Sequence, residues 1–164
     1  GSLVFVTVRH TIYASDAIAT VEEHDIVYRE AAKPGDPPAA AKAAPASAQW
    51  QREIAPGPTM LFRFSALTFN GHRIHYDRTY ATDVEKYPGL VVHGPAQAVL
   101  LFDAATRRQP DGRPASFTFR GVRPLFDFDT VSLNGKANAD GGLDLFTANA
   151  EGAIGMQASL TWAA

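Results

Sequence analysis

Two residues in the middle of the chain, His75 and Gly94, are of types that can move a proton and polarise a carbonyl. A histidine with an unperturbed pKa of about 6.5 both accepts and donates a proton near neutral pH. Gly94 precedes Pro95, and a proline suits the first turn of a helix. An amide at a helix N-terminus is a free hydrogen-bond donor that the helix dipole reinforces. The spacing therefore predicts one site that holds an imidazole and a main-chain N–H.

The composition is that of a folded globular chain and argues against several classes of function. At 164 residues the chain can form one ordinary domain with a full core, and pieces of a second. Its net charge of −2 argues against nucleic-acid and anionic-membrane partners, because both favour a basic excess. The chain contains no cysteine, so it has neither a disulfide framework nor a thiolate site. No apolar run approaches the roughly 18 to 20 residues that span a bilayer.

The elements that must position this site are preceded by two predicted strands. Residues 3–14 alternate in side-chain type, and a second such run follows over residues 17–29 after a turn near Ser15 and Asp16. Two strands alone cannot bury enough apolar surface to be stable. We therefore expect residues 1–30 to pair with strands elsewhere in this chain or in another. Residues 31–49 are rich in alanine and proline, which is typical of a solvated linker.

Helices are predicted around the candidate site itself. Residues 54–70 fit a helix that begins near Thr59, but alternation in the same stretch also fits a strand. Asp77 is a candidate cap for a short helix over residues 81–85. A longer helix is predicted from Pro95 to about Arg108. Its mostly apolar surface, which should lie against a sheet, is formed by Ala96, Val99, Leu100 and Phe102 with Asp103.

The remainder of the chain predicts that sheet. Strand-like runs cover residues 115–122, 130–133, 143–149 and 153–162. Strong turn signals stand at Asn134-Gly135, which should end the second of these strands, and at 140–142. One buried helix followed by four antiparallel strands is an α+β arrangement.

The sequence SALTFNGHRIHYD at 65–77 also carries a resemblance to a known family. Together with the segments 92–95 and 119–126 and the final Gly155-Met156, it resembles the MaoC-like enoyl-thioester hydratases. The similar branch contains mesaconyl-C4-CoA hydratase and the mitochondrial-type 3-hydroxyacyl-thioester dehydratases. The resemblance implies a hot-dog fold, with residues 50–164 as the catalytic second half of a double hot dog. It implies that residues 1–30 are the last strands of a first half that is otherwise absent from this chain.

The resemblance also implies roles for particular residues. The family's catalytic histidine corresponds to His75, and its carboxylate, five residues earlier, corresponds to Asn70. An amide cannot ionise to act as a base, so we expect His75 to be the single acid/base, with Asn70 orienting the hydroxyl or water. Gly94 corresponds to the donor to the thioester oxygen. Arg73, His93 and Pro95 are expected to contact substrate.

Each of these residues has a structural alternative. Gly94 can simply ease the turn into a proline-led helix, and His93 and Arg73 can hold their loops through hydrogen bonds. His72, His75 and Asp77 have the spacing of a small metal cluster, but three ligands on one short loop are a weak signal, and we expect no metal. Basic residues that could meet coenzyme A phosphates, or could equally form an exposed helix end, are Arg107, Arg108 and Arg113.

The resemblance implies a hydro-lyase that needs no cofactor and reversibly hydrates an enoyl thioester of coenzyme A or acyl carrier protein. The expected partners are that thioester and either the missing half or a second copy of the chain. A bacterial protein of this kind is expected in the cytoplasm, and a eukaryotic one in mitochondria. Asn70 leaves open a non-catalytic thioester-binding subunit of a heteromeric dehydratase. Thioester hydrolysis on the same fold lacks an obvious carboxylate in the motif.

Overall fold

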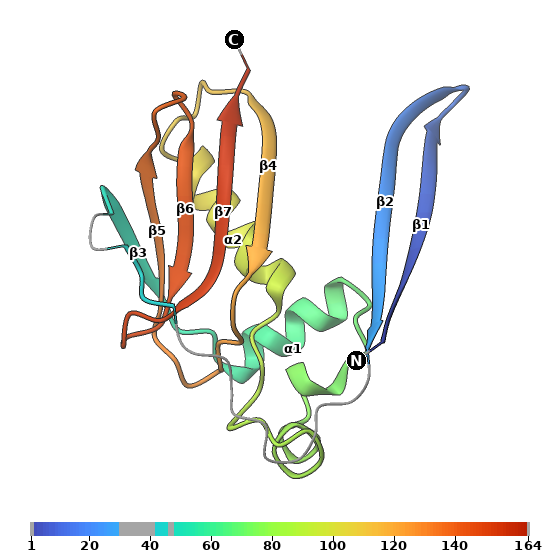
Figure 1. Ribbon diagram of the computed structural model, residues 1–164, viewed down its shortest axis with the longest axis vertical. Coiled ribbons are helices and arrows are strands. Elements are labelled where there is room, and N and C mark those ends of the chain that lie inside the picture. The colour runs from blue at the N-terminus through green and yellow to red at the C-terminus, as the bar shows by residue number, and fades with distance from the viewer. Residues whose placement is uncertain (1, 30–41, 46–47, 164) are drawn as a thin grey trace. The chain divides into compact units, whose positions relative to one another are not determined.

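The structure, a computed structural model, describes residues 2–29, 42–45 and 48–163. Residues 1–38 and 39–164 form two units. In the first, strands β1 (Leu3–Ala14) and β2 (Ala17–Arg29) form an antiparallel hairpin, as the alternation predicts (Figure 1). Ser15 makes the turn with a positive φ of 55°. Large apolar side chains are exposed on both strands, among them Phe5, Ile12, Ile18 and Val27.

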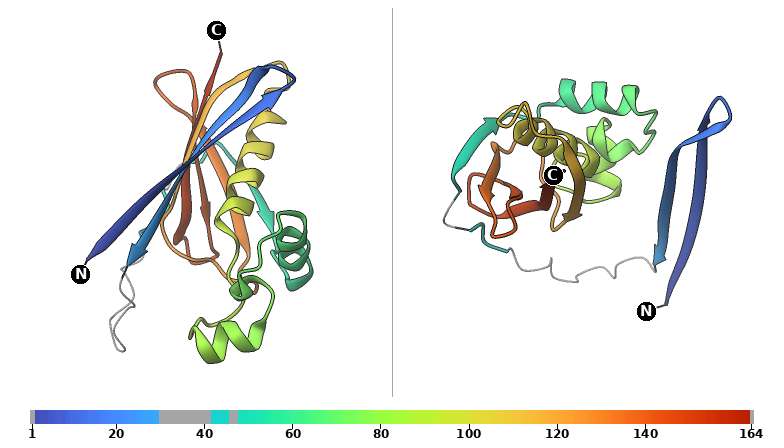
Figure 2. Two further views of the ribbon diagram at one scale, coloured as in Figure 1. Left: turned by 90° about the vertical axis from the view of Figure 1, so that its right-hand side faces the viewer. Right: turned by 90° about the horizontal axis from the view of Figure 1, so that it is seen from above.

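The second unit is built on a five-stranded antiparallel sheet in the order β3-β5-β6-β7-β4. Its strands are β3 (Trp50–Ile54), β4 (Pro114–Gly121), β5 (Val131–Ala137), β6 (Leu143–Ala148) and β7 (Ile154–Trp162). Helix α2 (Gly94–Thr106) lies against one face of this sheet (Figures 1 and 2). This is the predicted α+β arrangement with one further strand, β3.

The core lies between α2 and the sheet. Small side chains of the helix, such as Ala98 and Ala105, let it approach the sheet, and Leu101 packs with Leu133 and Leu160. Val99, expected in the contact face, is instead 58% exposed. The helix is apolar nearly all round, so its sequence did not determine which side faces the sheet.

Three shorter elements precede α2. Helix α1 (Pro58–Leu67) resolves the ambiguous stretch in favour of a helix with proline in its first turn. A 3₁₀ turn, η1 (Arg73–His75), and a π-helical turn, η2 (Tyr80–Val84), follow. The carboxylate of Asp77 accepts a hydrogen bond from the N–H of Tyr80 at 3.0 Å, which confirms the predicted cap. A second apolar cluster, containing Leu61, Val92 and Leu125, joins α1 to the sheet.

The structure corrects one turn prediction and confirms another. Asn134 and Gly135 lie inside β5, where Gly135 pairs with Trp50 of β3. A Cβ on Gly135 would lie 2.2 Å from the indole, so the glycine is needed for packing. The signal at 140–142 does mark a turn, in which Gly141 has a φ of 77°.

The predicted linker falls largely outside the described residues. Within the described part, the N–H of Ala44 donates to Gly152 O and that of Ile154 donates to Lys42 O.

Candidate active site

The imidazole of His75 is held by the backbone of Val91. The N–H of Val91 donates to Ile74 O at 3.0 Å, and His75 Nδ1 lies 2.7 Å from Val91 O. A carbonyl oxygen can only accept, so Nδ1 carries the proton and Nε2 is the free basic nitrogen of the neutral ring. The 3₁₀ turn thus presents a histidine in one defined tautomer.

The segment that contains Val91 is fixed on its other side by the loop after β4. The N–H of Val92 donates to Leu125 O at 2.8 Å, and the N–H of Leu90 donates to Asp127 Oδ1 at 2.9 Å. The buried carboxylate of Asp127 is also ion-paired with Arg78. These contacts join the His75 turn to the start of α2, so the two motif segments cannot move independently.

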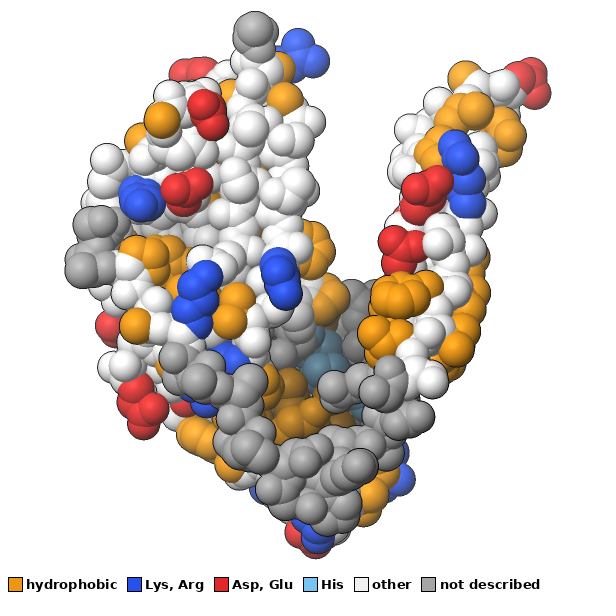
Figure 3. Space-filling view, viewed as in Figure 1, with side chains coloured by type: hydrophobic (Ala, Val, Ile, Leu, Met, Phe, Trp, Pro, Cys, Tyr) orange, Lys and Arg blue, Asp and Glu red, His pale blue; other side chains and the backbone are white. Residues whose placement is uncertain are grey.

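His75 and Gly94 line the same pocket, so the structure brings these two residues together. The pocket has a volume of about 320 Å³ and also includes Val92, Gly121, Val122, Pro124 and Met156. Pale-blue histidine side chains are visible next to hydrophobic side chains in the second unit (Figure 3). A proton-transfer group and a helix-terminal amide therefore face one cavity with largely apolar walls.

Gly94 is the first residue of α2, where main-chain N–H groups lack partners within the helix. A Cβ built on it would meet only the Cε of Met156, at 4.0 Å. Its φ also lies outside the left-handed region that requires glycine. Neither packing nor backbone conformation therefore demands glycine here, which weighs against the simple turn alternative.

His93 lies behind His75. Its ring is fully buried and stacks on that of His75, with centroids 3.7 Å apart and planes 18° from parallel. His93 Nε2 is 2.8 Å from Ser65 Oγ, and Phe64 covers the ring at 4.8 Å. Its Nδ1 is buried without a hydrogen-bond partner among the described residues. Burial, with the charge of His75 adding to it, lowers the pKa of His93 to about 4, so the ring is neutral at pH 7.

Burial and a neighbouring charge also act on His75. Burial lowers its pKa, the hydrogen bond to Val91 opposes this, and nearby His72 lowers it further. No aspartate or glutamate is among the described residues that line the pocket. The ring is therefore neutral at pH 7 and is available as a base.

The remaining candidate residues lie outside this pocket. Asn70 borders a neighbouring hollow with Phe69 and Tyr76, and its Oδ1 accepts a hydrogen bond from the N–H of His72 at 3.0 Å. Arg73 donates to Asp77 at 3.1 and 2.7 Å and so holds the loop, and Pro95 is an exposed residue of the first helical turn. The structure does not bring Asn70, Arg73, His93 or Pro95 to the pocket surface.

Sequence reasoning missed two polar residues of this region, Ser65 and Gln97. Gln97 lines the pocket, is buried, and accepts a hydrogen bond from Thr147 Oγ1 at 2.6 Å. A glutamine in the first turn of a mostly apolar helix was the signal that could have identified it. Ser65 stood in the quoted motif, but only the fold shows that it meets His93.

Basic side chains adjoin the pocket. Arg123 lines it, and an adjoining hollow that shares Gly121 and Val122 is lined by Lys42 and Arg120. Within the described ranges none of these three cations has a carboxylate within salt-bridge distance. Arg107, by contrast, pairs with Asp103, and Arg108 lies over the Trp50 ring at the far end of α2.

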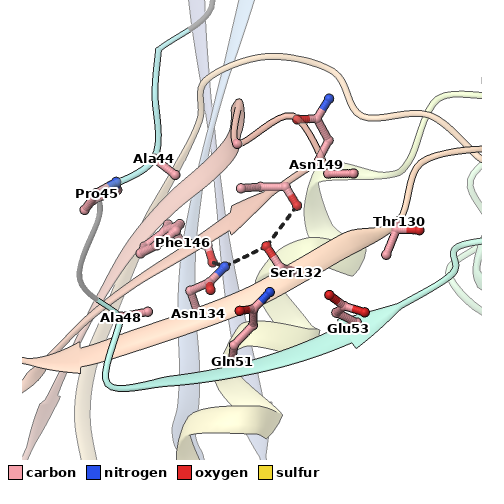
Figure 4. Close-up of a pocket in the computed structure, with 13 residues that line it drawn as sticks. Ala44, Pro45, Ala48, Gln51, Glu53, Thr130, Ser132, Asn134, Phe146 and Asn149 are labelled. Carbon is pink, nitrogen blue, oxygen red and sulfur yellow. Dashed lines mark hydrogen bonds between the residues drawn. The ribbon is translucent and has the colours of Figure 1, made fainter.

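A larger pocket of about 450 Å³ lies over the sheet on the opposite face from α2 (Figure 4). Its polar groups are bonded to one another, since Asn134 donates to Ser132 and Ser132 donates to Ala148 O. Among the described residues that line it there is no histidine, and Glu53 is the only one that ionises. These features describe a satisfied polar surface better than a reactive site.

Across the described part of the chain, no group of three or more His, Asp or Glu residues is placed to hold a metal ion. No helix in that part is long and apolar enough to cross a membrane.

The antiparallel sheet and the central helix α2 that lies against it define a hot-dog fold. Solved structures share this fold at low sequence identity. HtdX from Mycobacterium tuberculosis is 17% identical with a TM-score of 0.67, over 95% of this chain and 61% of that one. The (R)-hydratase of A. caviae is 18% identical with a TM-score of 0.60, over 69% of this chain and 92% of that one.

The chain belongs to the hydroxyacyl-thioester dehydratase type 2 family, whose model matches residues 1–127. It is 46% identical to mesaconyl-C(4)-CoA hydratase of Chloroflexus aurantiacus, over 98% of this chain and 56% of that protein. It is 42% identical to the mitochondrial hydroxyacyl-thioester dehydratase type 2 of Schizosaccharomyces pombe, over 43% of this chain and 24% of that protein. The chain thus spans little more than half the length of the first relative.

Proposed function

We propose that residues 50–164 are the catalytic half of a hydro-lyase that reversibly hydrates an enoyl thioester. The observation that carries this proposal is the shared pocket of His75 and Gly94. The histidine presents a free Nε2, and the glycine presents the first amide of a helix. Family membership and the names of the relatives favour this chemistry over other reactions of a histidine.

In the hydration direction, neutral His75 accepts a proton from water through Nε2 while the water oxygen bonds to C3 of the enoyl group. The electron pair of the double bond moves toward the thioester carbonyl, and the Gly94 N–H donates a hydrogen bond to that oxygen. The imidazolium then returns the proton to C2, which completes the 3-hydroxyacyl thioester. One base that accepts and then donates is sufficient, and no cofactor takes part.

We propose that Asn70 orients the water or hydroxyl from the separate hollow that it borders, since it does not line the His75–Gly94 pocket itself. Its Oδ1 is already engaged by the N–H of His72, so the Nδ2 group is the part left to donate. This differs from the family's carboxylate, which can itself accept a proton.

We propose a coenzyme A thioester as the substrate. Lys42, Arg120 and Arg123 line the pocket and the hollow that adjoins it, and a phosphate-bearing carrier would complement them. The Chloroflexus relative is named for mesaconyl-C(4)-CoA, and this mesaconyl group favours a short branched acyl group over a long chain.

We further propose that residues 1–30 are the last strands of a first hot-dog half, with residues 31–49 as the linker. The hairpin exposes apolar side chains along both of its strands, so it needs further strands to cover them. These can come from a preceding half or from a second copy of the chain.

The test is the loss of enoyl absorbance when the full chain is incubated with crotonyl-CoA or mesaconyl-C4-CoA. We expect turnover, and a decrease in kcat of about 10²- to 10⁴-fold in His75→Ala. His24→Ala, which removes an exposed histidine of β2, is the matched control. Near-native turnover by His75→Ala would refute the assignment.

Asn70 favours a second candidate, a thioester-binding subunit that does not catalyse. In that case the chain would bind crotonyl-CoA without consuming it, and His75→Ala would leave the dissociation constant unchanged. Release of free thiol would instead indicate thioester hydrolysis.

A further inference from the structure

Behind His75 lies a buried pair of polar side chains that the proposed reaction does not use. Ser65 on α1 and His93 at the start of α2 meet through Oγ and Nε2 at 2.8 Å. Both are almost fully buried, with 5% and 0% of their surfaces exposed. Such a buried hydrogen-bonded pair fixes side-chain orientation, because an alternative rotamer would leave both groups unsatisfied.

The stacking geometry shows what this pair can orient. The His93 ring stacks on one face of the His75 ring, with ring centroids 3.7 Å apart. Phe64 packs against His93, with ring centroids 4.8 Å apart. Rings this close and nearly parallel leave no room for water between them. Because Nδ1 is bound to Val91 O, Nε2 is the ring nitrogen of His75 that is left to face the pocket.

We propose that Ser65 and His93 are a positioning pair that holds the imidazole of His75 and keeps one of its faces dry. The inference rests on the proposed function of His75. His93 contributes as a flat neutral ring and not as an acid or base. Ser65 contributes by fixing the plane of that ring.

Other ionisable groups near His75 must be separated from this effect. His72 meets His75 edge-on at 5.5 Å from the same turn, and Arg123 lines the pocket from the loop after β4. The facing residues of α2 and β7, Gln97 and Met156, do not ionise. Both His72 and Arg123 remain in the variants below, so their contributions cancel in the comparison.

The experiment measures the pKa of the His75 ring by NMR in the full chain, together with kcat and KM for crotonyl-CoA. In His93→Ala water reaches the exposed face, so we expect the pKa of His75 to rise toward 6.5 and kcat to fall about 100-fold. His93→Phe keeps a flat ring, so we expect the pKa to stay low and kcat to remain within about tenfold of the unaltered chain. Ser65→Ala should lower kcat about tenfold with KM unchanged, because the His93 ring is no longer fixed.

Ser132→Ala is the matched control. It removes the hydrogen bond from Ser132 Oγ to Ala148 O, on the face of the sheet opposite α2, and it should change neither the pKa of His75 nor kcat. The proposal is overturned if Ser65→Ala and His93→Ala leave the His75 pKa and kcat unchanged, or if His93→Phe is as damaging as His93→Ala. If His93→Ala does not fold, Ser65→Ala and His93→Phe still decide the matter. An inactive chain that retains the pKa pattern would reject the hydratase function while supporting the positioning pair.

Discussion

Protonation of the buried His93 gives the most direct quantitative test of the structure. Its pKa of about 4 lies below the value near 6.5 expected in the unfolded chain. A group whose pKa is depressed by folding binds protons more tightly when unfolded, so acid destabilises the folded state. The stability that the neutral His93 ring gives the folded state is fully present above pH 6.5 and is lost as the pH falls toward 4.

The size of the effect follows from the two pKa values. Relative to pH 7, the titration of His93 should lower the free energy of unfolding by about 2 kcal/mol at pH 5 and by about 3 kcal/mol at pH 4. The assay is urea unfolding at pH 7 and pH 5, followed by fluorescence of Trp50 and Trp162, both of which lie in the second unit. Carboxylates and the other histidines also titrate, so the informative quantity is the difference from His93→Phe.

In His93→Phe the specific loss of about 2 kcal/mol between pH 7 and pH 5 should be absent. The phenylalanine ring is larger than the imidazole, and it lowers the free energy of unfolding of His93→Phe equally at both pH values. This effect therefore cancels when the values at pH 7 and pH 5 are subtracted. Equal pH dependence in the two proteins would contradict a buried, neutral His93. It would also remove the physical basis for the dry face of His75.

Further predictions concern the pocket and its surroundings. Gly94→Ala should change the free energy of unfolding by less than about 1 kcal/mol, because the added Cβ has room. The same Cβ narrows the pocket, so the substitution should lower kcat/KM for crotonyl-CoA. Urea unfolding and steady-state kinetics separate the two effects. Asn70→Asp should raise the pKa of His75, because a nearby negative charge favours the imidazolium, and should shift the acidic limb of the kcat/KM profile to higher pH. Replacing Arg120 and Arg123 by glutamine should raise KM for crotonyl-CoA by up to about fivefold per charge at low salt. It should leave KM for a crotonyl thioester without phosphates unchanged, and an equal effect on both substrates would contradict a phosphate-binding role.

The sequence predicted those parts of the fold that depend on local patterns. Alternation located the strands, and Pro95 located the start of α2 to within a residue. Strand β3 was missed because its central residues are exposed and give no alternating pattern. The prediction of a turn at Asn134-Gly135 was wrong. Position 135 requires glycine because the ring of Trp50 packs against it, and this contact joins residues far apart in the sequence.

The sequence also predicted only some residues of the candidate site. His75 and Gly94 were found from residue type and motif, and both line the pocket. The position of His93 could not be found, since neither burial nor ring stacking is visible in a histidine within a loop motif. Asn70 was recognised as a departure from the family, but only the fold shows that its Oδ1 is engaged within its own loop.

The β1–β2 hairpin should be less protected from amide hydrogen exchange than the second unit. Within the described residues its strands pair only with each other, while the second unit carries both buried apolar clusters. Amide hydrogens in the hairpin should therefore exchange with deuterium through local opening, long before those of β6 and β7. Slow exchange there in solution would reveal that another polypeptide lies over the two strands.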